Sequence, residues 1–361
     1  MSRKRKKSSM QDIADILGIS KNAVSLAIND KEGISESLKA KIIETAEEIG
    51  YLKSSQTKKE SDNLLWIMDG ECDCEGGFYA PLISAVLRYA KEKGYNMQIV
   101  NINRKVQQKN LIPNEYYEIK AVGVLFLGIF EAEYLRQFLM MKIPSVMMVH
   151  HHYGVALSHV LSANLDAGYM VTKYLIDKRH SKIGFLAEIG MFDTFRQRRN
   201  GYRQALSDAG IDYKTEYEIV DEGADGEVTD YVEQRVKRIC RMEDPPTAWV
   251  CGNDYLAIAL MGAMWKEGKK IPEDISIVGI DGIEAAGLVH PKLCTYEVGI
   301  EQLGRRSVDA LLQKISGGDG VSPEIWNILG KLQEGESVKT YEFNKRCERR
   351  GRMPFFRCAL I

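Results

Sequence analysis

The sequence lacks the features of a membrane-spanning or secreted protein. No stretch approaches the ~18 consecutive apolar residues of a transmembrane helix. The basic run at residues 3–7 is not followed by an apolar segment, so it is not a secretory signal. Seven cysteines are scattered without a Cys-x-x-Cys pair, which is typical of reduced thiols rather than of a disulfide framework. We therefore expect a cytoplasmic protein that does not contact a membrane.

Motifs for catalysis and metal binding are also missing. Residues 278–282 are the nearest candidate for a phosphate-binding loop, but they match neither the Gly-x-Gly-x-x-Gly nor the Walker pattern. Cys72 and Cys74 have no second Cys or His pair at zinc spacing. The three successive histidines from His150 are expected on a strand, where adjacent side chains alternate in direction and do not converge on one ion. We expect no enzyme activity, no cofactor and no metal, with a sugar kinase as the enzyme alternative.

Length and charge divide the chain into a head and a body. At roughly 150 residues per domain, 361 residues predict two or three domains. Residues 1–60 carry 12 Lys and Arg against 9 Asp and Glu, whereas the remainder carries 37 against 41. A basic head on an acidic body indicates that the head meets a polyanion. The alternative is that the basic run at residues 3–7 is only a solubilising tail.

The first 50 residues have the pattern of three short helices. Ser9 can cap the first helix, with Asp12 in the capping-box position. Gly18 ends that helix, because a residue without Cβ adopts the left-handed turn readily. Ser20 and Ser35 can cap the second and third helices, and the third ends at Gly50. Two short helices joined by a tight glycine turn, with a third closing the core, predict a helix-turn-helix.

In a helix-turn-helix the second helix enters the major groove of DNA, led by its N-terminal residues. Asn can pair with adenine, and Lys can donate to guanine or to phosphate. Small hydroxyls and the helix N-terminus suit phosphates. A three-helix bundle that binds protein is the alternative. The candidate DNA-binding residues are Ser9, Ser20, Lys21, Asn22, Ser25, Leu26 and Asn29.

The body alternates apolar runs with amphipathic segments. The pattern predicts strands at 64–68, 97–101, 122–127, 145–149, 183–187, 217–220, 248–251 and 275–280. Helices are predicted at 81–93, 132–141, 168–177, 199–209, 228–242 and 255–267. Alternating strands and helices predict parallel sheets covered on both faces. Since these elements exceed one simple sheet, we expect an α/β core of two similar lobes.

Ligands of such sheets bind beyond the C-terminal ends of the strands. Polar residues follow the predicted strands at 69–71, 150–153, 188–196, 253–254 and 281. Arg196 is the strongest candidate, because a guanidinium offers a planar fork of donors. Carboxylates, an amide and an arginine opposed across two lobes suit a polar ligand such as a sugar. The alternative for Asn253 and Asp254 is that they simply cap the following helix.

Several motifs resemble those of the lactose-repressor (LacI/GalR) family of transcription regulators. In the head they are residues 10–29, MQDIADILGISKNAVSLAIN, and residues 34–51, which end in Gly-Tyr. In the body they are WVCGND at 249–254, KIPEDISIVGIDG at 270–282, Arg-x-x-x-x-Gly-Tyr at 196–202 and HPKLCT at 290–295. The resemblance covers residues 9–338.

The resemblance implies a periplasmic-binding-protein-like core with a small-molecule effector between its lobes. Arg196, Asn253 and Asp281 would contact the effector, with Arg198 as a neighbour, and Phe78 and His150 are further candidates. Lys21 and Asn22 would read bases, and Ser20, Ser25 and Asn29 would contact phosphates. We expect domains at 1–52 (DNA-binding), 53–62 (linker), 63–340 (effector-binding and dimerisation) and 341–361 (tail). A homodimer, with a tetramer as the larger alternative, would bind a near-palindromic double-stranded operator and act as a regulator, more often a repressor than an activator.

The sequence departs from the family pattern at several positions. Leu26 stands where the family usually has arginine, so an unusual operator half-site is expected. Lys53 replaces a proline, and Glu60 falls where a leucine would wedge into the minor groove. Asn164 and Val298 replace common polar residues of the effector pocket. The effector class therefore stays open, and a dimeric regulator with a decayed pocket is the alternative.

Overall fold

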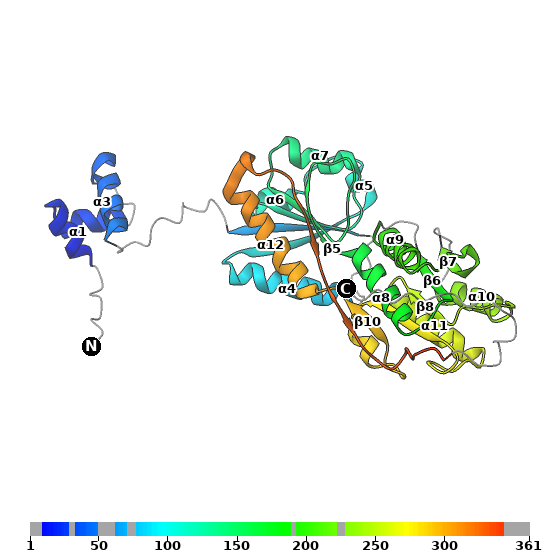
Figure 1. The fold of residues 1–361 in the computed structure, drawn as a ribbon. Coiled ribbons are helices and arrows are strands. Elements are labelled where there is room, and N and C mark those ends of the chain that lie inside the picture. The colour runs from blue at the N-terminus through cyan, green and yellow to red at the C-terminus, as the bar shows by residue number, and fades with distance from the viewer. Residues whose placement is uncertain are drawn as a thin grey trace, which may run out of the picture. The chain divides into compact units, whose positions relative to one another are not determined.

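The computed structural model describes residues 9–28, 33–49, 62–70, 77–188, 193–221 and 228–342. The chain forms two compact units, Met1–Ser61 and Asp62–Ile361 (Figure 1). Among the described residues, no helix is long and apolar enough to cross a membrane. Asn29, the linker residues Lys53 and Glu60, the Cys72–Cys74 pair and the arginine-rich tail beyond residue 342 lie outside the described residues.

The first unit contains three helices, α1 (Met10–Leu17), α2 (Lys21–Ile28) and α3 (Glu36–Glu48). Ser9 forms the predicted capping box, in which its backbone N–H donates to Asp12 Oδ2 at 2.7 Å. Gly18 adopts a φ of 64° and ends α1, as predicted. Six small or branched apolar side chains close the core between the helices: Ile13, Ala14, Val24, Ala27, Ile42 and Ala46. The predicted helix-turn-helix is confirmed.

The second unit contains two lobes, each built on a six-stranded sheet. Lobe 1 has the strand order β11-β5-β4-β3-β1-β2, and all of its strand pairs are parallel. Its strands are β1 (Asn63–Asp69), β2 (Asn96–Ile102), β3 (Val124–Leu127), β4 (Ser145–Met148), β5 (Ser158–Ser162) and β11 (Ile325–Ile328). Its helices are α4 (Tyr79–Glu92), α5 (Arg104–Gln107), α6 (Asn114–Glu118), α7 (Ala132–Met140) and α12 (Ile300–Gly317).

Lobe 2 has the strand order β12-β10-β9-β8-β6-β7, in which only β12 runs antiparallel to its neighbour. Its strands are β6 (Ile183–Glu188), β7 (Glu218–Asp221), β8 (Ala248–Cys251), β9 (Ser276–Asp281), β10 (Cys294–Glu297) and β12 (Lys331–Gln333). Its helices are α8 (Asn164–Asp177), α9 (Asp193–Asp208), α10 (Val228–Cys240) and α11 (Asp254–Lys266), with short 3-10 turns η1 (Thr215–Tyr217) and η2 (Glu284–Gly287). Turn η3 (Gly318–Gly320) follows α12 in lobe 1.

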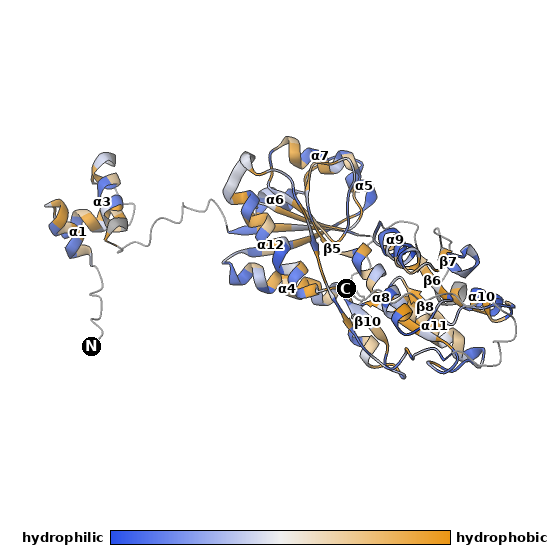
Figure 2. Cartoon of the chain, viewed as in Figure 1, coloured by the Kyte–Doolittle hydropathy of each residue, from blue (hydrophilic) through white to orange (hydrophobic). Residues whose placement is uncertain are grey.

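The chain passes between the lobes three times: from β5 to α8, from β10 to α12 and from β11 to β12. The central strands are buried along their whole length, as in β3, β4, β8 and β9. Apolar residues concentrate in the strands and on the inner faces of the helices (Figure 2). Sheets covered by helices on both faces need such continuous apolar strands. The predicted two-lobed parallel α/β core is confirmed.

Several element boundaries differ from the sequence prediction. Helix α8 begins four residues before the predicted start at Gly168, and α9 begins six residues before Arg199. The first turns of both helices mix polar with apolar residues, so they carry little apolar periodicity. Strand β5 was missed because its buried sequence, Ser-His-Val-Leu-Ser, is partly polar. The three histidines from His150 follow β4 in a loop, so the expectation that they lie on a strand is wrong.

Candidate functional site

The N-terminus of α2 presents the polar side chains of the head. Lys21 and Asn22 are exposed, whereas Ser25 and Leu26 are half-buried. The Ser20 hydroxyl accepts a hydrogen bond from the backbone N–H of Ala23 at 3.1 Å and so caps the helix. Capping fixes the helix start and leaves the first-turn side chains free to point outward. The surface therefore offers an ammonium and an amide at a helix N-terminus, which is the arrangement that a base-reading helix needs.

A buried arginine forms the centre of the polar groups in lobe 2. Arg198 of α9 is 3 % exposed. Its Nε donates to Asn164 Oδ1 at 3.0 Å, its Nη1 to the Gly252 carbonyl oxygen at 2.6 Å and its Nη2 to Asp281 Oδ1 at 2.8 Å. These partners come from the start of α8 and from the ends of β8 and β9. A charged donor with partners in three different segments fixes the ends of β8 and β9 against the start of α8.

Two glycines place Arg198 at this position. Gly168 of α8 and Gly201 of α9 face each other where the two helices cross. A Cβ at Gly201 would overlap the Leu165 carbonyl oxygen and lie 2.6 Å from the Tyr169 nitrogen. A Cβ at Gly168 would lie 2.7 Å from the Arg198 carbonyl carbon. Only glycine allows this approach of the two backbones, and the approach brings the Arg198 side chain within reach of Asn164.

Asp254 organises the turn that follows β9. Its Oδ2 accepts hydrogen bonds from the backbone N–H groups of Gly282 and Ile283 at 2.8 and 2.9 Å. Its Oδ1 accepts from the Thr295 hydroxyl at 2.6 Å. Burial, together with the nearby charge of Asp281, raises the pKa of Asp254 to about 7. Asp281 itself has a φ of 127°, which is unusual for a residue with Cβ.

Asp254 should make the stability of the second unit depend on pH. Its ordinary pKa is 3.8 and its folded-state pKa is about 7, so between these values the folded state binds more protons than the unfolded state. The contribution of Asp254 to the stability is then fully present below pH ~4 and is lost as the pH rises toward 7. We expect urea unfolding at pH 5 and pH 7.5 to show this decrease, and Asp254→Asn to reduce it. An equal pH slope in both proteins would contradict the assignment.

Lobe 1 contributes several imidazoles to a hollow between the lobes, which we call the cleft. A small hollow is lined by Gly128, Ile129, Phe130, Met147, His150, His151, His152 and Asp193. Burial lowers the pKa of His150 to about 4, and burial together with His151 lowers the pKa of His159 to about 4. Both imidazoles are therefore neutral at physiological pH. Among the described residues, no group of three His, Cys, Asp or Glu side chains is placed to hold a metal ion.

Two contacts join the lobes at the rim of the cleft. The Tyr153 hydroxyl of lobe 1 donates to Asp193 Oδ2 of lobe 2 at 2.8 Å. Arg196 pairs with the same carboxylate and remains exposed. The Phe78 side chain packs against apolar clusters of both lobes, so it fills the space between them.

The structure separates the predicted ligand residues into two groups. Arg198 and Asp281 meet in the buried network, and Asn253 lies beside them with its side chain capping α11 through Leu256 N at 2.9 Å. Arg196 lies at the rim, and Asn164, noted only as a departure from the family pattern, is a partner of Arg198. The helical spacing could have pointed to Arg198, because Arg198 stands three residues before Gly201 and so lies on the same face of the helix.

Comparison with known families matches most of the first unit and part of the second. The family model of "Bacterial regulatory proteins, lacI family" matches residues 9–54. The "Periplasmic binding protein-like domain" model matches residues 172–338.

The chain belongs to the lacI family of bacterial regulatory proteins.

Full-length relatives of this lacI-family regulator are named as repressors. It is 27 % identical over 336 residues to the "HTH-type transcriptional repressor PurR" of Vibrio atlanticus, covering 92 % of this chain and 98 % of the relative. It is 27 % identical over 312 residues to the "Ribose operon repressor" of Escherichia coli strain K12, covering 85 % of this chain and 93 % of the relative. The regulator is thus a DNA-binding protein of transcription and not an enzyme.

Solved structures share its fold. A complex of the transcriptional regulator CelR with cellobiose superimposes with a TM-score of 0.67 at 21 % identity, covering 91 % of this chain and 99 % of that chain. A LacI-family regulator from Enterococcus faecium with bound ribose gives a TM-score of 0.65 at 17 % identity, covering 77 % of this chain and all of that chain. These likenesses support the two-lobed fold of the regulator.

Proposed function

We propose that this regulator represses transcription in the bacterial cytoplasm by binding an inverted-repeat operator as a homodimer. A small polar effector in the cleft between the lobes controls the binding. The observation that carries the proposal is the capped α2, which leaves Lys21 and Asn22 exposed at its first turn. Two copies of the helix related by two-fold symmetry would read two half-sites.

The charges of the cleft favour an uncharged effector. Arg198 is neutralised by Asp281 and Arg196 by Asp193. The pKa values of His150 and His159 are lowered to about 4, so these imidazoles add no charge. We propose that Arg198, Asn253 and Asp281 contact the effector from lobe 2, with Arg196 at the rim. Phe78 and His150 would contact it from lobe 1.

An uncharged polyol such as a sugar matches these hydrogen-bonding groups. The cellobiose and ribose seen with related folds support this class. Thermal unfolding with a panel of sugars that includes both tests the proposal, because a ligand that binds only the folded state raises the melting temperature. If no sugar or other metabolite raises it, the decayed-pocket alternative is favoured.

Asn22→Ala should weaken binding to the selected operator. The operator is first selected from a random pool of duplexes at stated salt concentration. Loss of one side chain that reads a base costs about 1–3 kcal/mol and relaxes specificity at that base pair. Lys41→Ala is the control, because Lys41 is an exposed charge on α3 rather than on α2. Equal losses for both variants on every duplex would contradict base reading by α2.

Leu288→Asp should shift the regulator from dimer to monomer. Leu288 of lobe 2 is 72 % exposed, and a large apolar side chain left in water is a candidate for a contact surface between two copies. Leu111→Asp is the control, since Leu111 is 62 % exposed but belongs to lobe 1. Analytical ultracentrifugation measures the state of each protein. A wild-type protein that is monomeric at micromolar concentration would contradict the proposal.

A further inference from the structure

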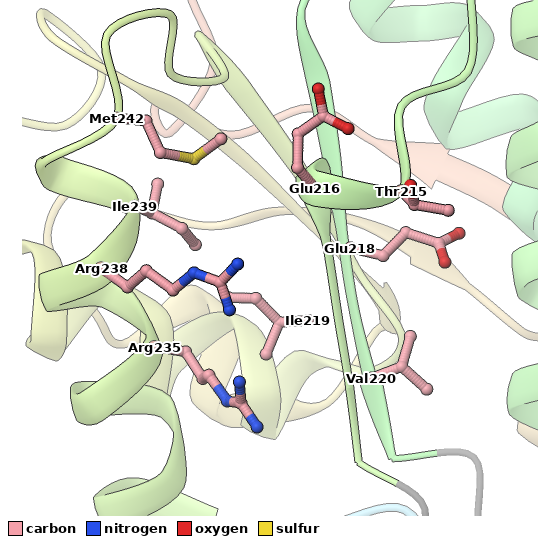
Figure 3. Close-up of a pocket in the computed structure, with 9 residues that line it drawn as sticks. All are labelled: Thr215, Glu216, Glu218, Ile219, Val220, Arg235, Arg238, Ile239 and Met242. Atoms are coloured by element: carbon pink, nitrogen blue, oxygen red, sulfur yellow. The ribbon is translucent and has the colours of Figure 1, made fainter.

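A groove lies at the outer edge of lobe 2, between edge strand β7 and helix α10. Its lining residues are Thr215, Glu216, Glu218, Ile219, Val220, Arg235, Arg238, Ile239 and Met242 (Figure 3). Its cavity volume is about 140 Å³, close to the roughly 150 Å³ that accommodates a benzene ring. None of these residues lines the hollow of the interlobe cleft.

Helix α10 places two guanidiniums over this groove. The buried face of α10 packs against the rest of lobe 2 through Val232, Val236 and Ile239. Arg235 and Arg238 are three residues apart, so they lie on one flank of the helix beside that face. In Figure 3 both side chains extend from α10 toward β7.

The glutamate of β7 does not neutralise these arginines. Glu218 points to the opposite side of β7 from Ile219, which extends toward the arginines (Figure 3). On that side Arg199 Nε donates to Glu218 Oε1 at 2.9 Å, and Arg203 Nε donates to the same oxygen at 3.2 Å. Burial alone would raise the pKa of Glu218, but hydrogen bonds from Arg199, Tyr213 and Arg203 outweigh it and hold that pKa below its usual range.

The groove therefore offers the guanidinium of Arg238 beside an apolar floor, and the carboxylate of Glu216 also belongs to its lining. The Arg238 guanidinium forms no ion pair or hydrogen bond within the described part of the chain. Arg235 has an interaction of its own, but the five donors of a guanidinium can hold it and a ligand together. Ile219 and Ile239 supply the apolar surface.

We propose that the groove between β7 and α10 is a second ligand site, for a small organic anion. Its carboxylate or phosphate group pairs with Arg238 and Arg235, because the planar fork of a guanidinium matches such groups. Its compact apolar body contacts Ile219, Ile239 and Met242. The site is separate from the effector cleft, so it does not depend on the proposed function.

Methyl NMR of the full-length protein with phenyl phosphate at constant ionic strength tests this site. The methyl groups of Ile219, Ile239 and Met242 report on the groove, Met147 reports on the cleft and Ile13 on the head. We expect saturable shifts of the three groove methyls alone. Inorganic phosphate, which lacks the apolar body, should bind the same site more weakly.

Arg238→Gln should weaken phenyl phosphate binding by about tenfold or more, as expected for loss of a charge-assisted pair. Arg241→Gln removes the same charge from an exposed position outside the groove and should leave the affinity nearly unchanged. Both substituted side chains are exposed, so both variants should fold. The site is refuted if the groove methyls do not saturate, if the shifts are confined to Met147 or Ile13, or if the two variants lose equal affinity.

Discussion

Arg198→Met is expected to destabilise the second unit by about 3–5 kcal/mol, because it leaves one member of a buried ion pair without its partner. Asp281 would keep a carboxylate that is 7 % exposed, and the carbonyl oxygen of Gly252 would lose its donor. Without the arginine, the pKa of Asp281, already raised by burial, should rise further. The loss should therefore be larger at pH 8 than at pH 5, since a carboxyl with a raised pKa takes up a proton more readily at the lower pH.

Two variants separate this effect from a simple loss of packing. Arg196→Met removes an exposed guanidinium from the same helix, and such surface pairs contribute about 0–1 kcal/mol. Asp281→Asn in the Arg198→Met background removes the stranded charge and should restore part of the stability. Urea unfolding of all three proteins measures this. A loss for Arg198→Met that is the same at both pH values would show that the ion pair does not dominate.

Gly201→Ala is expected to destabilise the second unit by about 3 kcal/mol or more. In a helix without close neighbours, alanine is more stable than glycine by about 1 kcal/mol. The expected destabilisation therefore comes entirely from the crossing of α8 and α9. The added Cβ would meet backbone atoms of Leu165 and Tyr169, which cannot rotate away. The two helices must separate, and Arg198 then moves away from Asn164.

Gly262→Ala is the matched control for this prediction. Gly262 also lies in a helix, α11, but apart from its own chain neighbours and helix backbone no described atom lies within 4 Å of the position that its Cβ would occupy. Its replacement should be neutral or stabilising in denaturant unfolding. If Gly201→Ala is as stable as Gly262→Ala, the close crossing of α8 and α9 is wrong.

Much of the fold could be predicted from the sequence where local patterns and burial agree. Ser9, Gly18 and Ser20 marked the ends of the head helices because caps and left-handed turns are local properties of the chain. Eight strands of the two lobes were visible as short apolar runs because both faces of each sheet are covered, whereas β5, β10, β11 and β12 were not predicted. Strand β5 was not visible, because its buried His159 and serines find partners only in the folded lobe.

The candidate site was predicted less completely than the fold. Asn253 and Asp281 could be placed because they directly follow strands whose ends meet at one edge of a sheet. Arg196 was chosen for its guanidinium, which Arg198 also has. The helical phase that buries Arg198 becomes visible only once α9 is known to begin at Asp193. The groove between β7 and α10 is lined by side chains from two separate segments, so no local sequence pattern predicts it.

The three passages of the chain between the lobes have a consequence for synthesis on the ribosome. The head closes its core with residues 13–46, so it can fold as soon as that segment has emerged. Neither lobe has that advantage, since β11 of lobe 1 and β12 of lobe 2 arrive only at residues 325–333. The nascent chain thus carries a finished DNA-reading unit well before the unit that responds to a ligand is complete.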